Sequence, residues 1–72
     1  MDISIHYNVE RGFEEAALRL ARRLFAELDE SIDSLELIPV EDEDMAVSLN
    51  GRLVHSVSQS GRLPRLADLQ VE

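Results

Sequence analysis

The sequence predicts a small α/β (α+β) domain of order β-α-β-β-β-α, in which a four-stranded mixed sheet carries both helices on one face. Three observations predict this fold. Residues 2–7 alternate between polar and apolar side chains, which is typical of a half-buried strand. Residues 13–28 repeat apolar side chains at intervals of three and four, as one face of a helix does. Asn50 and Gly51 stand between two alternating runs, and Asn-Gly is the strongest short-range hairpin signal.

The composition indicates a single domain and excludes several functional classes. The chain has 72 residues, no cysteine and a net charge of −8, so we expect one domain over residues 1–72 without disulfide or thiol chemistry. The acidic balance argues against nucleic acid and anionic membranes as partners, because phosphate binding needs a basic surface. No long apolar run and no signal-peptide pattern occurs, so we expect a cytoplasmic protein.

The long helix follows a short turn at residues 8–12. Asn8 is predicted to be its N-cap, because the side-chain oxygen of asparagine can accept an orphan amide proton. The predicted apolar stripe of the helix consists of Phe13, Ala17, Leu20, Ala21, Leu24 and Leu28, widened by Leu18 and Phe25. Residues 34–40 form the second strand, and Pro39 marks a strand end or an edge. A strand, a helix and a strand in this order form a right-handed crossover, so the two strands should pair in parallel.

The hairpin and the segments around it complete the predicted sheet. The acidic residues 41–44 before the hairpin are interpreted as a solvated loop. A two-residue turn sets the register of the hairpin. The expected pairs are Leu49–Arg52, Ser48–Leu53, Val47–Val54, Ala46–His55 and Met45–Ser56. The expected core face of the sheet is Ile3, Ile5, Tyr7, Leu35, Leu37, Met45, Val47, Leu49 and Val54. After a loop at residues 58–62, Pro64 is predicted to begin a short helix that ends at Leu69.

The order of elements and three short segments resemble the Rdx family, the selenoprotein W-like branch of the thioredoxin-like proteins. Tyr7 ends the first strand directly before the helix entry, and residues 50–56 (Asn-Gly-Arg-Leu-Val-His-Ser) are similar to the family's hairpin and following strand. Gly61-Arg62-Leu63-Pro64 matches its Gly-x-Phe-Pro loop, with Leu63 in place of Phe. The resemblance covers nearly the whole chain and implies a thioredoxin-like fold.

The sequence departs from this family at the residues that carry its chemistry. Members of the family have Cys-x-x-Cys or Cys-x-x-selenocysteine after the tyrosine, and here those two positions are Asn8 and Arg11. The family reaction needs a thiolate at the start of the helix, which neither residue can supply. A cation in the first helical turn is unfavourable unless an acidic group meets it, so Arg11 is a hint of a contact with a partner.

These residues make the former redox corner the candidate binding site. Its expected residues are Tyr7, Asn8, Arg11, Gly12, Leu63 and Pro64. We expect a non-catalytic protein-binding module. The alternative is an accessory or regulatory protein of cell redox or sulfur metabolism that binds a thiol protein or a glutathione-like peptide at the same corner. The corner can also be a helix start without function. No catalytic set, phosphate loop or calcium-loop spacing is present, so neither catalytic residues nor a cofactor is expected.

The sheet face away from the helices is the second candidate surface. Its predicted members include His6, Leu53 and His55, and it can be solvated, bind a partner or form a homodimer. The two histidines should stand roughly 9 to 10 Å apart, with one strand between them. That spacing is too wide for one zinc ion, and no third ligand is evident. We therefore predict no metal site and two half-exposed histidines.

Overall fold

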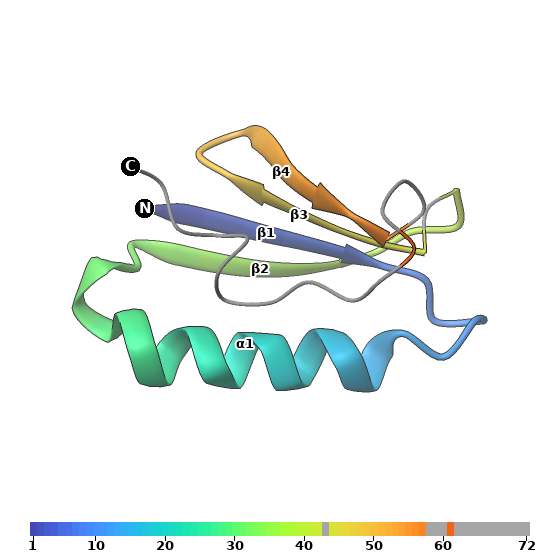
Figure 1. Ribbon diagram of the computed structural model, residues 1–72, viewed down its shortest axis with the longest axis horizontal. Coiled ribbons are helices and arrows are strands. Elements are labelled where there is room, and N and C mark those ends of the chain that lie inside the picture. The colour runs from blue at the N-terminus through green and yellow to red at the C-terminus, as the bar shows by residue number, and fades with distance from the viewer. Residues whose placement is uncertain (43, 58–60, 62–72) are drawn as a thin grey trace.

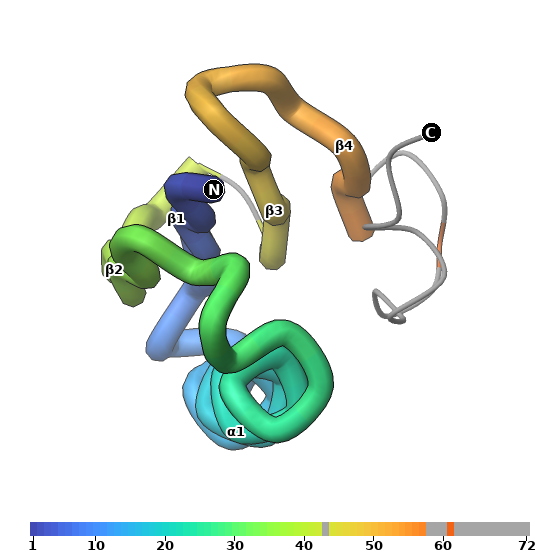
Figure 2. The backbone as a smooth tube through the Cα atoms, turned by 90° about the vertical axis from the view of Figure 1, so that its left-hand side faces the viewer, coloured from blue at the N-terminus to red at the C-terminus, as the bar shows by residue number. Residues whose placement is uncertain are grey.

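The computed structural model describes residues 1–42, 44–57 and 61. Their elements are β1 (Asp2–Tyr7), α1 (Glu14–Leu28), the 3-10 helix η1 (Asp29–Ser31), β2 (Ser34–Pro39), β3 (Met45–Leu49) and β4 (Arg52–Ser56). The strands form one four-stranded sheet in the order β2-β1-β3-β4 (Figure 1). Seen from the end of the sheet in Figure 2, α1 lies against one face of it. The predicted helix at residues 64–69 lies outside the described residues.

The pairing within the sheet confirms the predicted mixed topology. β1 pairs with β2 in parallel and with β3 in antiparallel orientation, so the first strand of the chain is an interior strand. The connection from β1 through α1 to β2 is the predicted crossover. Pro39 is the last residue of β2, an edge strand, where its missing N–H costs no ladder hydrogen bond.

The hairpin turn has the backbone that its two residues favour. Asn50 and Gly51 have φ angles of 52° and 82°, the positive values that a type I′ turn requires. The asparagine is also joined to the start of β1. Its backbone N–H donates to the carbonyl oxygen of Asp2 at 2.7 Å, and its side-chain Oδ1 accepts from the N–H of Asp2 at 2.9 Å. The turn therefore closes the hairpin and also fixes Asp2, the first residue of β1, through these two hydrogen bonds.

A β-bulge changes the predicted register of the hairpin. Leu49 pairs with Arg52 and Ser48 with Leu53, as expected, but Val47 lies opposite His55 and not opposite Val54. The extra residue on β4 is inserted between these pairs. Because Val47 belongs to the core face, the bulge turns His55 toward the side of α1, and only 7% of that residue is exposed. The predictions that His55 lies on the open face and is half-exposed are therefore wrong.

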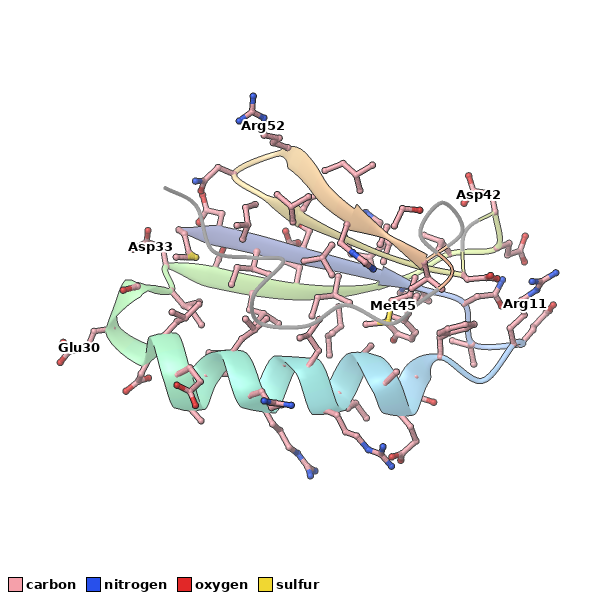
Figure 3. The ribbon with its side chains drawn as sticks, in the orientation of Figure 1. Arg11, Glu30, Asp33, Asp42, Met45 and Arg52 are labelled. Carbon is pink, nitrogen blue, oxygen red and sulfur yellow. The ribbon has the colours of Figure 1, made fainter. Side chains whose placement is uncertain are left out.

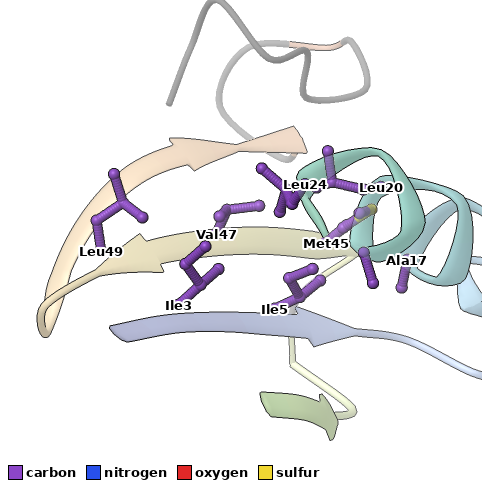
Figure 4. Close-up of a cluster of buried hydrophobic side chains, with 9 residues drawn as sticks. Ile3, Ile5, Ala17, Leu20, Leu24, Met45, Val47 and Leu49 are labelled. Atoms are coloured by element: carbon purple, nitrogen blue, oxygen red, sulfur yellow. The ribbon is translucent and has the colours of Figure 1, made fainter. Parts of the chain in front are cut away.

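The core lies between α1 and the adjacent face of the sheet (Figure 4). Its buried members are Ile3, Ile5, Ala17, Leu20, Ala21, Leu24, Met45, Val47 and Leu49, all of which were predicted. Two predicted members of the helical stripe lie outside it, because Leu18 is 39% and Phe25 is 47% exposed. Among the described residues, no helix is both long enough and apolar enough to cross a membrane.

Candidate functional site

The candidate site is the corner between β1 and α1, where the chain makes a compact turn. The N–H of Gly12 donates to the carbonyl oxygen of Val9 at 3.0 Å, and the N–H of Phe13 donates to that of Asn8 at 3.1 Å. Gly12 has a φ of 80°, which bends the chain away from helical geometry. The helix therefore begins only at Glu14, with Phe13 as an N-cap residue that makes no side-chain cap hydrogen bond. The prediction that Asn8 is the N-cap is wrong.

Asn8 instead holds the turn together and fastens it to the loop between β2 and β3. Its Oδ1 accepts from the N–H of Arg11 at 3.1 Å, and its Nδ2 donates to the carbonyl oxygen of Glu41 at 3.3 Å. Its backbone N–H donates to the carbonyl oxygen of Asp44 at 2.9 Å. Only 6% of the residue is exposed. Both ends of the amide side chain are thus used inside the molecule, in a structural role.

Arg11 forms a second link between the same two segments. Its Nη1 lies 2.9 Å from Oδ1 of Asp44, and the two side chains are 67% and 24% exposed. An acidic group was expected to offset the charge of Arg11 near the helix start, and Asp44 of the same chain supplies it. Residues 41–44 were predicted to be a solvated loop, but Asp44 at the end of this loop forms an ion pair with Arg11. Figure 3 shows Arg11 at the same end of the molecule as Asp42 and at the opposite end from Glu30 and Asp33.

The surface that this corner presents is apolar at one point and acidic around it. Val9 is 49% exposed and is one of the large apolar side chains that are exposed among the described residues. Glu10 precedes Arg11 in the turn, and Glu41 and Asp42 lie in the β2–β3 loop to which Asn8 and Arg11 are joined; all three carboxylate residues are exposed. Sequence reasoning missed Val9, although an apolar residue within a polar turn was a usable signal. It also missed Asp44, whose contact with Arg11 depends on how two distant loops are folded.

The remaining predicted site residues do not all belong to this corner. Tyr7 is half-buried and packs against the core, and its carbonyl oxygen accepts from the N–H of Val40 at 2.8 Å. Leu63 and Pro64 lie outside the described residues. The structure thus brings together Asn8, Arg11 and Gly12, and it assigns Tyr7 mainly to the core.

The second candidate surface is divided by the bulge. His6 and Leu53 belong to the face away from α1, where Leu53 is 52% exposed, whereas His55 is turned to the other side. No group of three or more metal-ligating side chains occurs within residues 1–42, 44–57 and 61.

Comparisons with known proteins agree with this architecture. The sequence matches the Rdx family over residues 2–72. Among solved structures, a selenoprotein W-related protein from Vibrio cholerae is similar to this chain, with a TM-score of 0.85 and 22% sequence identity. The similarity covers 94% of this chain and 85% of that chain. At this identity the structural likeness establishes the fold alone. No curated protein matches the sequence.

Proposed function

Because this chain belongs to the Rdx family and carries Asn8 and Arg11 at the two redox positions, we propose that it is a non-catalytic thioredoxin-like module that binds a protein through its β1–α1 corner. One observation carries the proposal: both residues are engaged in holding the corner in shape. Asn8 joins the turn to the β2–β3 loop, and Arg11 pairs with Asp44 in that loop.

The chemistry of these side chains supports a role without turnover. Thiol–disulfide exchange needs a thiolate as nucleophile, and the 72 residues contain no cysteine. An amide and a guanidinium supply neither a nucleophile nor a general base at neutral pH. A corner already fixed by several hydrogen bonds loses little conformational entropy on binding, which favours recognition by a preformed surface.

The composition of the corner indicates which chemistry a partner should have. An exposed valine offers an apolar contact, and Glu10, Glu41 and Asp42 give its surroundings a negative potential. We expect a partner segment with an apolar side chain flanked by basic ones. An anionic peptide such as glutathione is disfavoured by the same carboxylates, so a thiol protein is the better form of the redox-associated alternative.

A pair of matched variants tests where binding occurs. Val9→Gln and Leu53→Gln each replace a half-exposed apolar side chain without changing the net charge, the first at the corner and the second on the open sheet face. Proteins captured from native lysate are identified by mass spectrometry, and the purified candidate is then titrated against each variant. We expect Val9→Gln to weaken binding and Leu53→Gln to leave it unchanged. The reverse result would assign binding to the open face.

A double variant separates the charge of Arg11 from its structural role. Arg11→Asp combined with Asp44→Arg keeps an ion pair between the two segments while it moves the cation. Loss of binding by this folded variant would show that the partner contacts the Arg11 guanidinium. Turnover in an insulin-reduction assay would overturn the non-catalytic proposal. NMR shifts at residues 8–12 with millimolar glutathione would support the redox-associated alternative instead.

A further inference from the structure

A second surface of the molecule, on one flank of α1, combines exposed apolar residues with charges of both signs. Phe25 and Leu18 are 47% and 39% exposed, although the same helix buries Ala17, Leu20, Ala21 and Leu24. At 100° per residue, Arg22 falls on the same flank as these two side chains. Asp29 follows four residues after Phe25, and both charged residues are exposed. We call Leu18, Arg22, Phe25 and Asp29 the α1 flank.

We propose that the α1 flank is the contact surface between two copies of this chain, which pair with their α1 helices antiparallel about a two-fold axis at Phe25. A two-fold contact requires a surface that is complementary to itself. With a rise of 1.5 Å per residue, Arg22 lies about 4.5 Å before Phe25 along α1. Asp29 is the first residue of η1 and follows directly after α1 ends at Leu28. Reversal about Phe25 therefore sets each Arg22 toward the C-terminal end of α1 of the second copy, where Asp29 follows the helix. The two aromatic rings meet between these opposite charges.

Other antiparallel registers satisfy the surface less well. If Leu18 of one copy met Phe25 of the other, the two Arg22 side chains would face each other, and like charges would repel. If the axis passed through Leu18, each Arg22 would meet the acidic first turn of α1, but both Phe25 rings would extend past the contact. The register centred on Phe25 is the one that covers the more exposed of the two apolar side chains of the α1 flank and brings opposite charges together.

The overall charge of the chain also favours this surface for self-association. Two copies with a net charge of −8 repel each other, so a contact between them needs a face on which basic groups offset the acidic ones. Three of the seven basic residues, Arg19, Arg22 and Arg23, lie within α1. The β1–α1 corner is predominantly acidic and offers no such balance.

The oligomeric state, measured by sedimentation velocity and by NMR diffusion up to about 1 mM protein, tests the proposal. We expect a weak, reversible dimer, because one helix flank is small for an interface. Phe25→Glu should raise the dimer dissociation constant by at least about tenfold. Arg22→Glu and Asp29→Arg should each raise it by about three- to tenfold, and the double variant should restore it to within about threefold.

Matched controls distinguish the pairing from a general effect of charge. Arg23→Glu makes the same change as Arg22→Glu on the other side of the helix, and Glu30→Arg does the same for Asp29→Arg. Neither control should weaken the dimer. Circular dichroism confirms that each variant is folded. A monomer at all concentrations, or a folded double variant no stronger than the single variants, overturns the proposal. Loss of the dimer with Leu53→Glu but not with Phe25→Glu overturns it as well and assigns the contact to the open sheet face.

Discussion

The guanidinium of Arg11 and the carboxylate of Asp44 meet at 2.9 Å across a separation of 33 residues in the chain. This contact joins the turn before α1 to the end of the β2–β3 loop. A residue at a position of the family's redox motif thus serves to hold two loops together. The pair explains how an arginine is accommodated just before the start of a helix.

The Arg11–Asp44 pair should stabilise the fold only modestly. A double-mutant cycle with Arg11→Ala and Asp44→Ala should give a coupling energy of about 0.2–1 kcal/mol, because two-thirds of the arginine side chain is exposed. Salt should reduce the coupling further, since the Debye length falls to about 3 Å at 1 M. Urea unfolding at low and high salt measures both effects. A coupling that is the same at both salt concentrations would contradict the ionic interpretation.

Asn8 should matter more for stability than Arg11. Asn8→Ala removes the acceptor for the N–H of Arg11 and the donor to the carbonyl of Glu41, so it should cost about 1–3 kcal/mol. Hydrogen exchange at the Arg11 amide should accelerate as well. Val9→Ala, at the exposed neighbouring position, is the control and should change stability by less than about 0.5 kcal/mol. Equal effects of the two substitutions would refute the central role of Asn8.

Gly51→Val should destabilise the hairpin by about 1 kcal/mol or more. The φ of 82° at this position resists a β-branched residue, and an added Cβ would meet no other atom within 4 Å. The cost therefore comes from the backbone alone. Gly51→Asn is the control, since asparagine tolerates positive φ, and it should retain most of the stability. Thermal melting of both variants checks this, and an unchanged melting temperature for Gly51→Val would contradict the turn assignment.

Leu24→Ala should cost about 2–5 kcal/mol, because Leu24 is fully buried between α1 and the sheet. That loss is enough to unfold much of so small a domain. Leu18→Ala, on the same helix but 39% exposed, should cost far less. Chemical denaturation of the two variants compares them directly. A near-neutral Leu24→Ala would mean that a different face of α1 contacts the sheet.

The β-bulge predicts a specific set of cross-strand contacts. NMR should show nuclear Overhauser effects between the backbone protons of Val47 and His55, and between those of Ala46 and Ser56. A regular hairpin would instead connect Val47 with Val54. The latter pattern would restore the register that the turn alone predicts and return His55 to the open face.

Local patterns in the sequence were sufficient to predict most of the described secondary structure and the faces that form the core. The alternation of residues 2–7, the periodicity of residues 13–28 and the Asn50-Gly51 turn each report a backbone conformation that nearby residues determine. The buried core followed from combining these patterns, because the faces of strands and helices are set by their periods. The predicted crossover and the parallel pairing of the first two strands needed only a general rule of connection.

The features that sequence reasoning missed depend on contacts distant in the chain. Val54 is the extra residue of the bulge, and no glycine marks that position in the sequence. The sequence therefore predicted a regular hairpin register. Asn8 has a side chain suited to an N-cap, but the positive φ at Gly12 shifts the start of the helix to Glu14. Asn8 therefore bonds the turn and the β2–β3 loop instead of capping the helix. The partner of Arg11 could not be identified, because four acidic residues follow one another at positions 41–44.

The place of β1 in the sheet has a consequence for folding during synthesis. Of the four strands of the sheet, β1 leaves the ribosome before the others, yet it lies between β2 and β3, and its hydrogen bond to the Asn50 side chain of the hairpin turn spans 48 residues. At about 5–20 residues per second, a nascent chain waits several seconds between the emergence of Asp2 and that of Asn50. During this interval an interior strand has one edge without its partner. The β3–β4 hairpin, whose own strand pairing is local, supplies that partner only when it emerges.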